Sequence, residues 1–144
     1  MIFRGVSSEA PFFWLVLYRM NQRLKKGEKL KSRKQIKFLF EKNQNVFVYP
    51  IKYIWEFSSP KQDYPVQVLV SIPKRNFKRA VDRNRLKRLL REAYRKNKDI
   101  IYDNLNLNNK SVLLGLLYVG KEILTYDEIE KSVRKALLKI KENL

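Results

Sequence analysis

Residues 70–95 read VSIPKRNFKRAVDRNRLKRLLREAYR, and this stretch decides how the chain folds and what it binds. Its second half has the periodicity of a helix with two different faces. The apolar face carries Leu86, Leu89, Leu90, Ala93 and Tyr94. The opposite face carries Asn84, Lys87, Arg88, Arg91 and Arg95. Because Glu92 is the only acid of the stretch after Asp82, we predict that this helix faces a nucleic acid rather than water alone.

The overall composition points the same way. The chain has 144 residues, the length of one domain, and a formal net charge of +18. A charge of this size attracts phosphate backbones, and affinity gained in this way falls steeply with salt. An anionic membrane is the competing polyanion.

The residues that are missing exclude most kinds of enzyme. The chain has no cysteine and no histidine, which removes disulfides, the common zinc sites, imidazole bases and thiol nucleophiles. Its tightest acidic cluster, Asp127, Glu128 and Glu130, lies in the first turn of a predicted helix, where acids stabilise the helix end. We therefore expect no catalytic residue and no metal or cofactor bound by the protein itself. A reducing, cytoplasmic setting fits this composition.

The first residues differ in composition from the rest. Residues 12–18 are continuously apolar, but this run is far shorter than the roughly 20 residues that span a bilayer, and no signal-peptide cleavage site follows it. We predict an N-terminal extension at residues 1–19, outside a domain at residues 20–144. The extension is either the product of a misplaced translation start or a short apolar helix that docks on the domain or on a partner. No stable membrane association is expected.

The chain before the basic helix predicts one helix and an adjoining set of strands. Ser32 and Gln35 form a capping box for a helix that runs to about Glu41. Residues 46–57 are aromatic and β-branched, and Pro50 divides them into one bent strand or two short ones. Residues 58–63 have the composition of a hairpin turn. Residues 66–72 then alternate as a strand with one apolar face.

The remaining elements complete an α+β fold. The basic helix runs from about Lys78 to Asn97, and an Asn-rich connector at 103–110 follows the end of the helix. Residues 112–119 are continuously apolar, as in a strand covered on both faces. A second capping box, at 125–128, begins a terminal helix. The predicted order is α-β-β-β-α-β-α, which indicates a single two-layer sandwich of one sheet and its helices.

Two further features favour RNA as the partner. Ten Lys or Arg residues between Arg19 and Lys42 form a second basic segment. Aromatic residues follow the predicted strands at Phe47, Tyr49, Tyr53, Trp55 and Phe57. On an exposed face each stacks an unpaired base for roughly 1–3 kcal/mol, while core packing is the alternative for any one of them. A basic helix beside an aromatic sheet suits RNA with a single-stranded segment.

Residues 80–94, AVDRNRLKRLLREAY, resemble the signature of the protein subunit of bacterial ribonuclease P, which is Arg-Asn-Arg followed by Lys-Arg and a later Arg. The strand that ends in Ser-x-Pro-Lys-Arg and the segment 29–33 before the first helix resemble the same family, and the likeness covers about residues 25–143. The sequence of residues 118–122 is similar to that of family members from Bacteroidetes-like bacteria.

The resemblance implies a small protein that assists an RNA enzyme. Such proteins bind the catalytic RNA, one protein per RNA, and the single-stranded 5′ leader of precursor tRNA. The RNA, with Mg²⁺, cleaves the leader from the mature 5′ end. The resemblance also implies a left-handed βαβ crossover at the basic helix, although the usual hand is right.

The resemblance assigns roles to individual residues. Contacts to the catalytic RNA are expected from Arg83, Asn84, Arg85 and Arg88, and from Lys74, Arg75 and Arg79 in the turn before the helix. The leader groove is expected to be lined by Lys87, Arg91, Ile36, Phe40, Tyr53 and Trp55. Ile36 departs from the family pattern, in which aromatic residues are common at that position. The turn at 74–79 lacks the glycine of many members.

Other functions remain open on the sequence alone. The first is a ribosomal or RNA-chaperone-type binding protein without a role in cleavage. The second is an amphipathic protein of the membrane surface, suggested by residues 12–18 and the basic segments.

Overall fold

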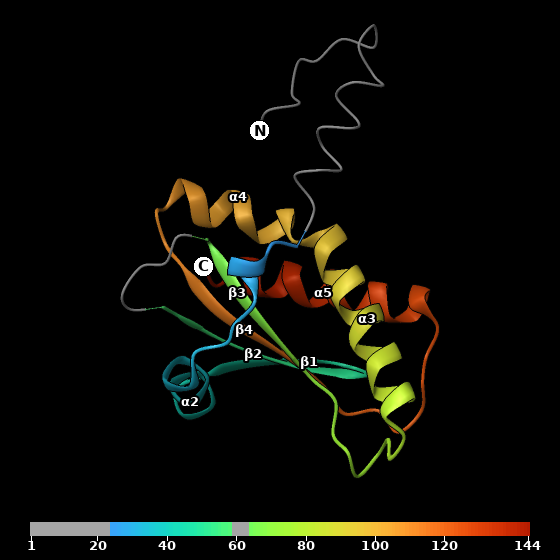
Figure 1. The fold of residues 1–144 in the computed structure, drawn as a ribbon. Helices are drawn as coiled ribbons and strands as arrows, with labels where there is room; N and C mark the ends of the chain where they lie inside the picture. Colours follow the sequence, from blue (N-terminus) through green and yellow to red (C-terminus); the bar gives the residue numbers. More distant parts are fainter. Residues whose placement is uncertain (1–23, 59–63) are drawn as a thin grey trace, which may run out of the picture.

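The computed structural model describes residues 24–58 and 64–144 of the chain (Figure 1). The predicted extension at residues 1–19 and most of the predicted turn at 58–63 lie outside the described residues. None of the helices in the described part is long and apolar enough to cross a membrane.

The observed elements follow the predicted order with two additions. The first half contains a short 3-10 helix η1 (Lys26–Glu28), helix α2 (Arg33–Glu41) and strands β1 (Gln44–Val48), β2 (Ile51–Phe57) and β3 (Val66–Ser71). The second half contains α3 (Ala80–Asn97), α4 (Asp99–Leu107), β4 (Val112–Tyr118) and α5 (Tyr126–Lys141). The additions are η1 and α4, and α4 replaces much of the predicted Asn-rich connector.

The strands form one mixed sheet in the order β1-β2-β4-β3. Strands β1 and β2 are an antiparallel hairpin joined at Tyr49 and a cis Pro50, so the predicted division at Pro50 gives two short strands. The predicted hairpin between β2 and β3 is wrong, because β4 lies between them, antiparallel to β2 and parallel to β3. Strands β3 and β4 are joined through α3 and α4, as in a βαβ unit. The left hand of this crossover stays a prediction.

Helices cover both faces of the sheet, which confirms the α+β class. Helices α3, α4 and α5 pack on one face over the large core, in which the four central apolar residues of α3, Leu86, Leu90, Ala93 and Tyr94, are buried. Helix α2 covers the other face over a smaller cluster of Leu30, Leu39, Ile54 and Leu113. Strand β4 is therefore buried on both sides, as its continuous apolar sequence predicts.

Local signals in the sequence explain where the helices begin. The Ser32 hydroxyl accepts a hydrogen bond from the Gln35 backbone N–H at 3.4 Å, which caps α2. At α5 both halves of the capping box are present: Thr125 Oγ1 accepts from Glu128 N at 3.4 Å, and a Glu128 carboxylate oxygen accepts from Thr125 N at 3.1 Å. The predicted capping box of α5 is confirmed, whereas at α2 only the Ser32 half of the predicted box is observed.

The layer between α2 and the sheet is thin at Gly115 in the middle of β4. A Cβ atom at this position would lie 2.8 Å from Cγ1 of Ile54 and 3.5 Å from Cδ2 of Leu39. The space that a side chain normally occupies is therefore filled by the neighbouring strand and by the underside of α2.

Candidate nucleic-acid interface

The turn before α3 is held in place by Arg83 from inside the helix. Its Nη1 atom donates hydrogen bonds to the backbone carbonyls of Phe77 and Lys78, each at 2.8 Å. Phe77 is buried, with its ring edge against Tyr118 at a centroid distance of 5.8 Å. The guanidinium and the buried ring thus fix the turn at 74–79, which has no glycine. Arg83 is half-buried and has a structural role that the sequence did not indicate.

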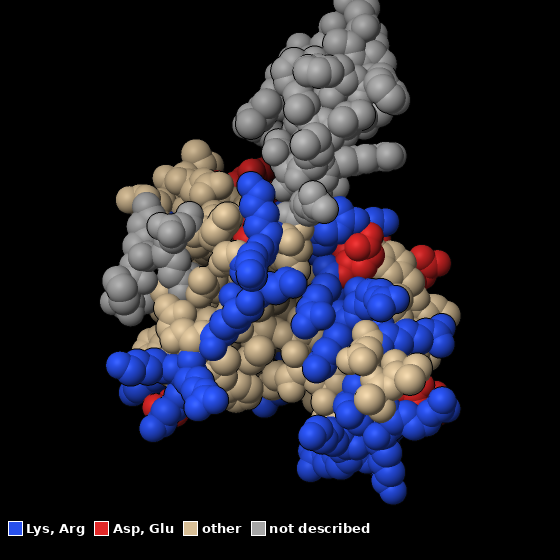
Figure 2. Space-filling view, viewed as in Figure 1, with Lys and Arg blue, Asp and Glu red and all other residues tan. Residues whose placement is uncertain are grey.

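The cationic face of α3 lines a pocket against the segment before α2. We call it the cationic pocket; it has a volume of about 430 Å³ and is lined by Leu24, Lys29, Asn84, Lys87, Arg88, Arg91, Glu92 and Arg95. Figure 2 shows Lys and Arg side chains gathered over α3 and the turn before it, with further Lys and Arg side chains across the same face, over α2 and the segment that precedes it.

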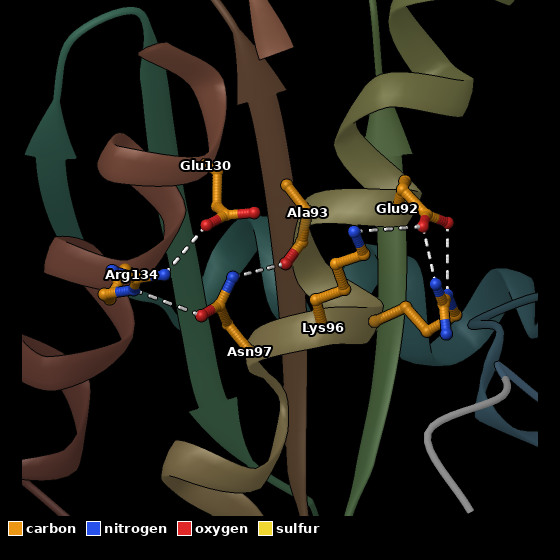
Figure 3. Close-up of polar contacts among 7 residues, drawn as sticks. Glu92, Ala93, Lys96, Asn97, Glu130 and Arg134 are labelled. Atoms are coloured by element: carbon orange, nitrogen blue, oxygen red, sulfur yellow. Dashed lines mark hydrogen bonds and ion pairs between the residues drawn. The ribbon is translucent and has the colours of Figure 1, made fainter. Parts of the chain in front are cut away.

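Most of the positive charge of the cationic pocket has no carboxylate partner. Glu92 is engaged by Arg95, whose Nε lies 3.1 Å from its carboxylate, and by Lys96 at 3.9 Å (Figure 3). The hydrogen bond from Arg95 lowers the pKa of Glu92 below its ordinary value, so this acid is ionised at neutral pH. Within the described residues, Lys29, Lys87, Arg88 and Arg91 form no ion pair. These cations favour binding of a polyanion.

The far wall of the cationic pocket is attached to the edge of the sheet. Lys29 forms a parallel bridge with Val68 of β3, and the Leu30 N–H donates to the Val68 carbonyl at 2.9 Å. The side-chain amide of Gln67 donates to the carbonyl of Gly27 at 3.1 Å. These contacts place Lys29 opposite a helix that lies far from it in the sequence.

The orientation of α3 is fixed by polar contacts with α5 (Figure 3). The Asn97 side-chain amide donates to the Ala93 carbonyl at 2.8 Å, and its oxygen accepts from Nε of Arg134 at 3.3 Å. Arg134 also pairs with Glu130 at 2.8 Å. Because these groups are buried or engaged with one another, they hold the basic helix at its place rather than contributing to its cationic face.

The cationic pocket brings together residues that the family resemblance had given separate roles. Asn84 and Arg88, expected on the catalytic RNA, line the same pocket as Lys87 and Arg91, expected on the leader. The other residues expected on the catalytic RNA do not line it: Arg83 braces the turn, and Lys74, Arg75, Arg79 and Arg85 are exposed. The roles of all these residues stay predictions.

Two cationic members of the pocket, Arg95 and Lys29, were not among the predicted site residues. Arg95 stands on the cationic face of the helix, so periodicity alone was sufficient to find it. Lys29 was quoted only as part of the family-like segment 29–33, because its approach to α3 depends on pairing with β3.

The second predicted wall of the leader groove requires a correction. On α2, Phe40 is 48% exposed, and Ile36 is half-buried against the small core. Tyr53 and Trp55, however, are 0% and 1% exposed, so they are not accessible to RNA in this structure. They point into the large core, where the Tyr53 hydroxyl lies 2.9 Å from the Ser132 hydroxyl.

Strand alternation identifies the residues that face α2 instead. Lys52 is exposed and Ile54 is buried under α2, both on the face opposite to Tyr53 and Trp55. Lys52 pairs across the hairpin with Phe47, which is 57% exposed. An exposed aromatic ring and a lysine therefore stand on the sheet face where the buried aromatics had been expected.

The acidic residues in the described part of the chain show no arrangement for metal binding. Within residues 24–58 and 64–144, no three His, Cys, Asp or Glu side chains come together in a way that could hold a metal ion. Of the predicted acidic cluster, Glu128 caps α5 and Glu130 pairs with Arg134.

Comparisons with known proteins agree with the signature helix. The family model described as Ribonuclease P matches residues 24–141. The ribonuclease P protein component of Porphyromonas gingivalis is 34% identical over 121 residues, which cover 84% of this chain and 88% of that protein. The protein component of Chlorobaculum tepidum is 34% identical over 102 residues, 66% of each chain.

Solved structures share the fold. The RNase P protein of Staphylococcus aureus superposes with a TM-score of 0.65 at 19% identity, over 81% of this chain and 97% of that one. The RNase P protein of Thermotoga maritima gives a TM-score of 0.58 at 20% identity, over the same shares of the two chains.

Proposed function

This chain belongs to the ribonuclease P protein family, and on that basis we propose that it is the protein subunit of ribonuclease P. It binds the catalytic RNA and the 5′ leader of precursor tRNA, and it promotes endonucleolytic removal of the leader. The observation that carries the proposal is the cationic pocket, in which the signature residues Asn84, Lys87, Arg88 and Arg91 converge with Lys29.

Contacts with the catalytic RNA fall to the exposed residues of the signature and of the turn. Asn84, Arg85 and Arg88 stand on the open side of α3, and Lys74, Arg75 and Arg79 extend this surface along the turn. Arg83 contributes mainly by holding the turn, since one of its nitrogens already donates to two carbonyls. Phosphate contacts of this kind fix the position of an RNA without reading its sequence.

Contacts with the leader fall to Lys87 and Arg91 at the cationic pocket and to the surface of α2 and the neighbouring sheet. Phe40 and Phe47 are exposed aromatic rings that suit stacking of unpaired bases. Lys52 supplies a cation beside Phe47. Tyr53 and Trp55 are not part of this surface, because they are buried.

The division of work between protein and RNA follows from the family. We propose that the catalytic centre and its Mg²⁺ belong to the RNA subunit and that one protein binds one RNA in the cytoplasm. The chain's own residues then act by binding and positioning the two RNAs, and by neutralising their phosphates where they approach each other.

A cleavage assay tests the proposal. The protein is added to the matching catalytic RNA at low Mg²⁺, and cleavage of precursor tRNA at its mature 5′ end is measured. Cleavage is expected to increase, because the protein's cations replace part of the Mg²⁺ needed to bring two polyanions together.

The same assay distinguishes a ribonuclease P subunit from an RNA-binding protein without a role in cleavage. An RNA chaperone or ribosomal protein would leave cleavage unchanged and bind unrelated structured RNAs with equal affinity. That combined result would overturn the proposal.

A further inference from the structure

A second pocket lies at the edge of the sheet, away from the signature residues. We call it the edge pocket; it has a volume of about 360 Å³ and is lined by Val48, Tyr49, Leu124, Glu128, Lys131, Ser132 and Lys135. Val48 packs toward the large core, so the edge pocket is on the face of the sheet that carries α5. Helix α2 covers the opposite face, and no residue of the cationic pocket lines the edge pocket.

The wall of the edge pocket is apolar and includes an available aromatic ring. Tyr49 is 59% exposed at the end of β1, beside the half-buried Val48 and Leu124. A large ring held at this exposure beside an apolar wall offers a stacking surface for a planar group.

The floor of the edge pocket is polar but already satisfied. The Ser132 hydroxyl donates to the Val48 carbonyl at 2.7 Å and lies 2.9 Å from the Tyr53 hydroxyl. These bonds join α5 to β1 and β2, so the pocket has a fixed floor and does not need a ligand to satisfy its buried groups.

The rim of the edge pocket is cationic. Lys131 and Lys135 stand one helical turn apart on α5, both exposed, and neither pairs with a carboxylate in the part of the chain that the structure describes. The one acid of the rim, Glu128, accepts a hydrogen bond from the Thr125 backbone N–H and so serves the helix cap. The rim therefore favours an anion.

Charge decides between the possible occupants. A second copy of this chain would bring together two molecules that each carry a net charge of +18. An acidic ligand with a flat apolar part satisfies both the ring and the lysines, and an unpaired nucleotide has these properties.

We propose that the edge pocket binds an unpaired nucleotide of RNA. The base stacks on Tyr49 against the apolar wall, and the phosphate lies between Lys131 and Lys135. This site is additional to the surfaces of α2 and α3; it lies on the face of the sheet that carries α3 and α5, at the edge formed by β1.

Photocrosslinking tests the location of the contact. The full chain is irradiated with a short single-stranded RNA that carries 4-thiouridine, and the crosslinked peptide is identified by mass spectrometry. A crosslink to the peptide that contains Tyr49 is expected, and it is expected to disappear in Lys131→Ala/Lys135→Ala. The matched control, Lys139→Ala/Lys141→Ala, removes the same charge from exposed positions of α5 outside the pocket and is expected to retain the crosslink.

Binding measurements test the energetic contribution. Tyr49→Ala is expected to weaken binding of the RNA that occupies the pocket by roughly 5- to 150-fold, the value of one base stack. The lysine double variant is expected to weaken the salt dependence of binding. The slope of log affinity against log salt concentration (the salt slope) should fall by roughly one to two for that RNA. Titrations with catalytic RNA and with precursor tRNA identify which of the two occupies it. Tyr49, Lys131 and Lys135 are exposed, and circular dichroism verifies that the variants are folded.

The proposal is overturned if Tyr49→Ala and the lysine double variant bind both RNAs as tightly as the unaltered chain. It is also overturned if sedimentation shows a dimer that depends on Tyr49, which would make a second copy the occupant. Stimulation of cleavage by the unaltered chain is a separate measurement, so failure of the edge pocket and failure of the ribonuclease P assignment are distinguishable.

Discussion

Lys98 Nζ lies 3.0 and 3.1 Å from the two carboxylate oxygens of Glu28, and the side chains of this ion pair are only 2% and 4% exposed. The pair connects η1 to the junction of α3 and α4. It stands next to Lys29, which forms the far wall of the cationic pocket. A buried pair of this kind costs desolvation energy, so its effect lies more in fixing position than in net stability.

Breaking the pair is expected to destabilise the fold. Glu28→Gln leaves Lys98 buried without its counter-charge and should lower the free energy of unfolding by about 3–5 kcal/mol, measured by urea denaturation. Glu28→Leu/Lys98→Met removes both charges and should recover most of this loss. If the single variant unfolds at the same urea concentration as the unaltered chain, the pair does not hold the segment.

Lys87 and Arg91 are expected to distinguish precursor from mature tRNA. Each change to Ala removes an unpaired cation of the cationic pocket and should weaken binding of precursor tRNA more than binding of mature tRNA, in filter-binding assays with the catalytic RNA present. Each should also reduce the salt slope by about one. Lys139→Ala, on the far end of α5, is the control. An equal loss for both tRNAs would reassign the two residues to the catalytic RNA.

Arg83 and Arg85 are expected to differ although both belong to the Arg-Asn-Arg signature. Arg83→Ala removes the donor to the Phe77 and Lys78 carbonyls and should lower the free energy of unfolding by about 1.5–3 kcal/mol. Arg85 is exposed, so Arg85→Ala should weaken binding of catalytic RNA while leaving thermal unfolding unchanged. Equal thermal stability of the two variants would remove the structural role of Arg83.

Glu92 is expected to limit the affinity of the cationic pocket. Glu92→Gln removes a negative charge from its lining and should tighten RNA binding by on the order of threefold at low salt. Because Arg95 lowers the pKa of Glu92, the acid stays ionised across neutral pH, and the difference should be constant from pH 5 to 8. The difference disappears only when Glu92 becomes protonated at lower pH. Weaker binding by the variant would show that orientation of Arg95 matters more than the removed charge.

Tyr53 is expected to make stability depend on alkaline pH. Burial raises the pKa of its hydroxyl well above the ordinary value, so the folded state retains this proton where the unfolded chain loses it. The contribution of Tyr53 to the free energy of unfolding is complete below the pKa of an unfolded tyrosine, near 10, and declines as the pH rises beyond that value. Tyr53→Phe should lower the free energy of unfolding by about 1 kcal/mol at pH 7. Above pH 10 the free energy of unfolding of this variant should fall less steeply than that of the unaltered chain, measured by denaturant titration. Equal slopes for both proteins would contradict this.

The sequence was most informative where structure is local. The apolar face of α3 and the two capping positions depend on neighbours within a few residues, and periodicity finds them. Helix α4 was missed because Asn104, Asn106 and Asn108 disfavour helix and favour turns, although Ile101 and Leu105 have helical spacing and are buried.

The errors in the candidate site come from pairing between distant segments. Residues 58–63 suggested a hairpin, but β4 inserts between β2 and β3, which no local turn signal reports. In β2 the family resemblance placed Tyr53 and Trp55 in the leader groove, whereas alternation directs Lys52 and Ile54 to that face. A strand read out of register by one residue exchanges its two faces. The Glu28–Lys98 pair spans 70 residues of sequence and has no signature of its own.

The missing side chain of Gly115 leaves room for the Ile54 side chain beneath α2. A single methyl group at this position would lie 2.8 Å from Ile54 Cγ1 and 3.5 Å from Leu39 Cδ2, so it would displace the buried Ile54 side chain while making an ordinary contact with α2. The packing beneath α2, the helix that carries Phe40, thus includes a position in β4 that accepts no side chain without moving Ile54. A Gly115→Ala change would therefore disturb the layer beneath α2 without replacing any exposed residue of that helix.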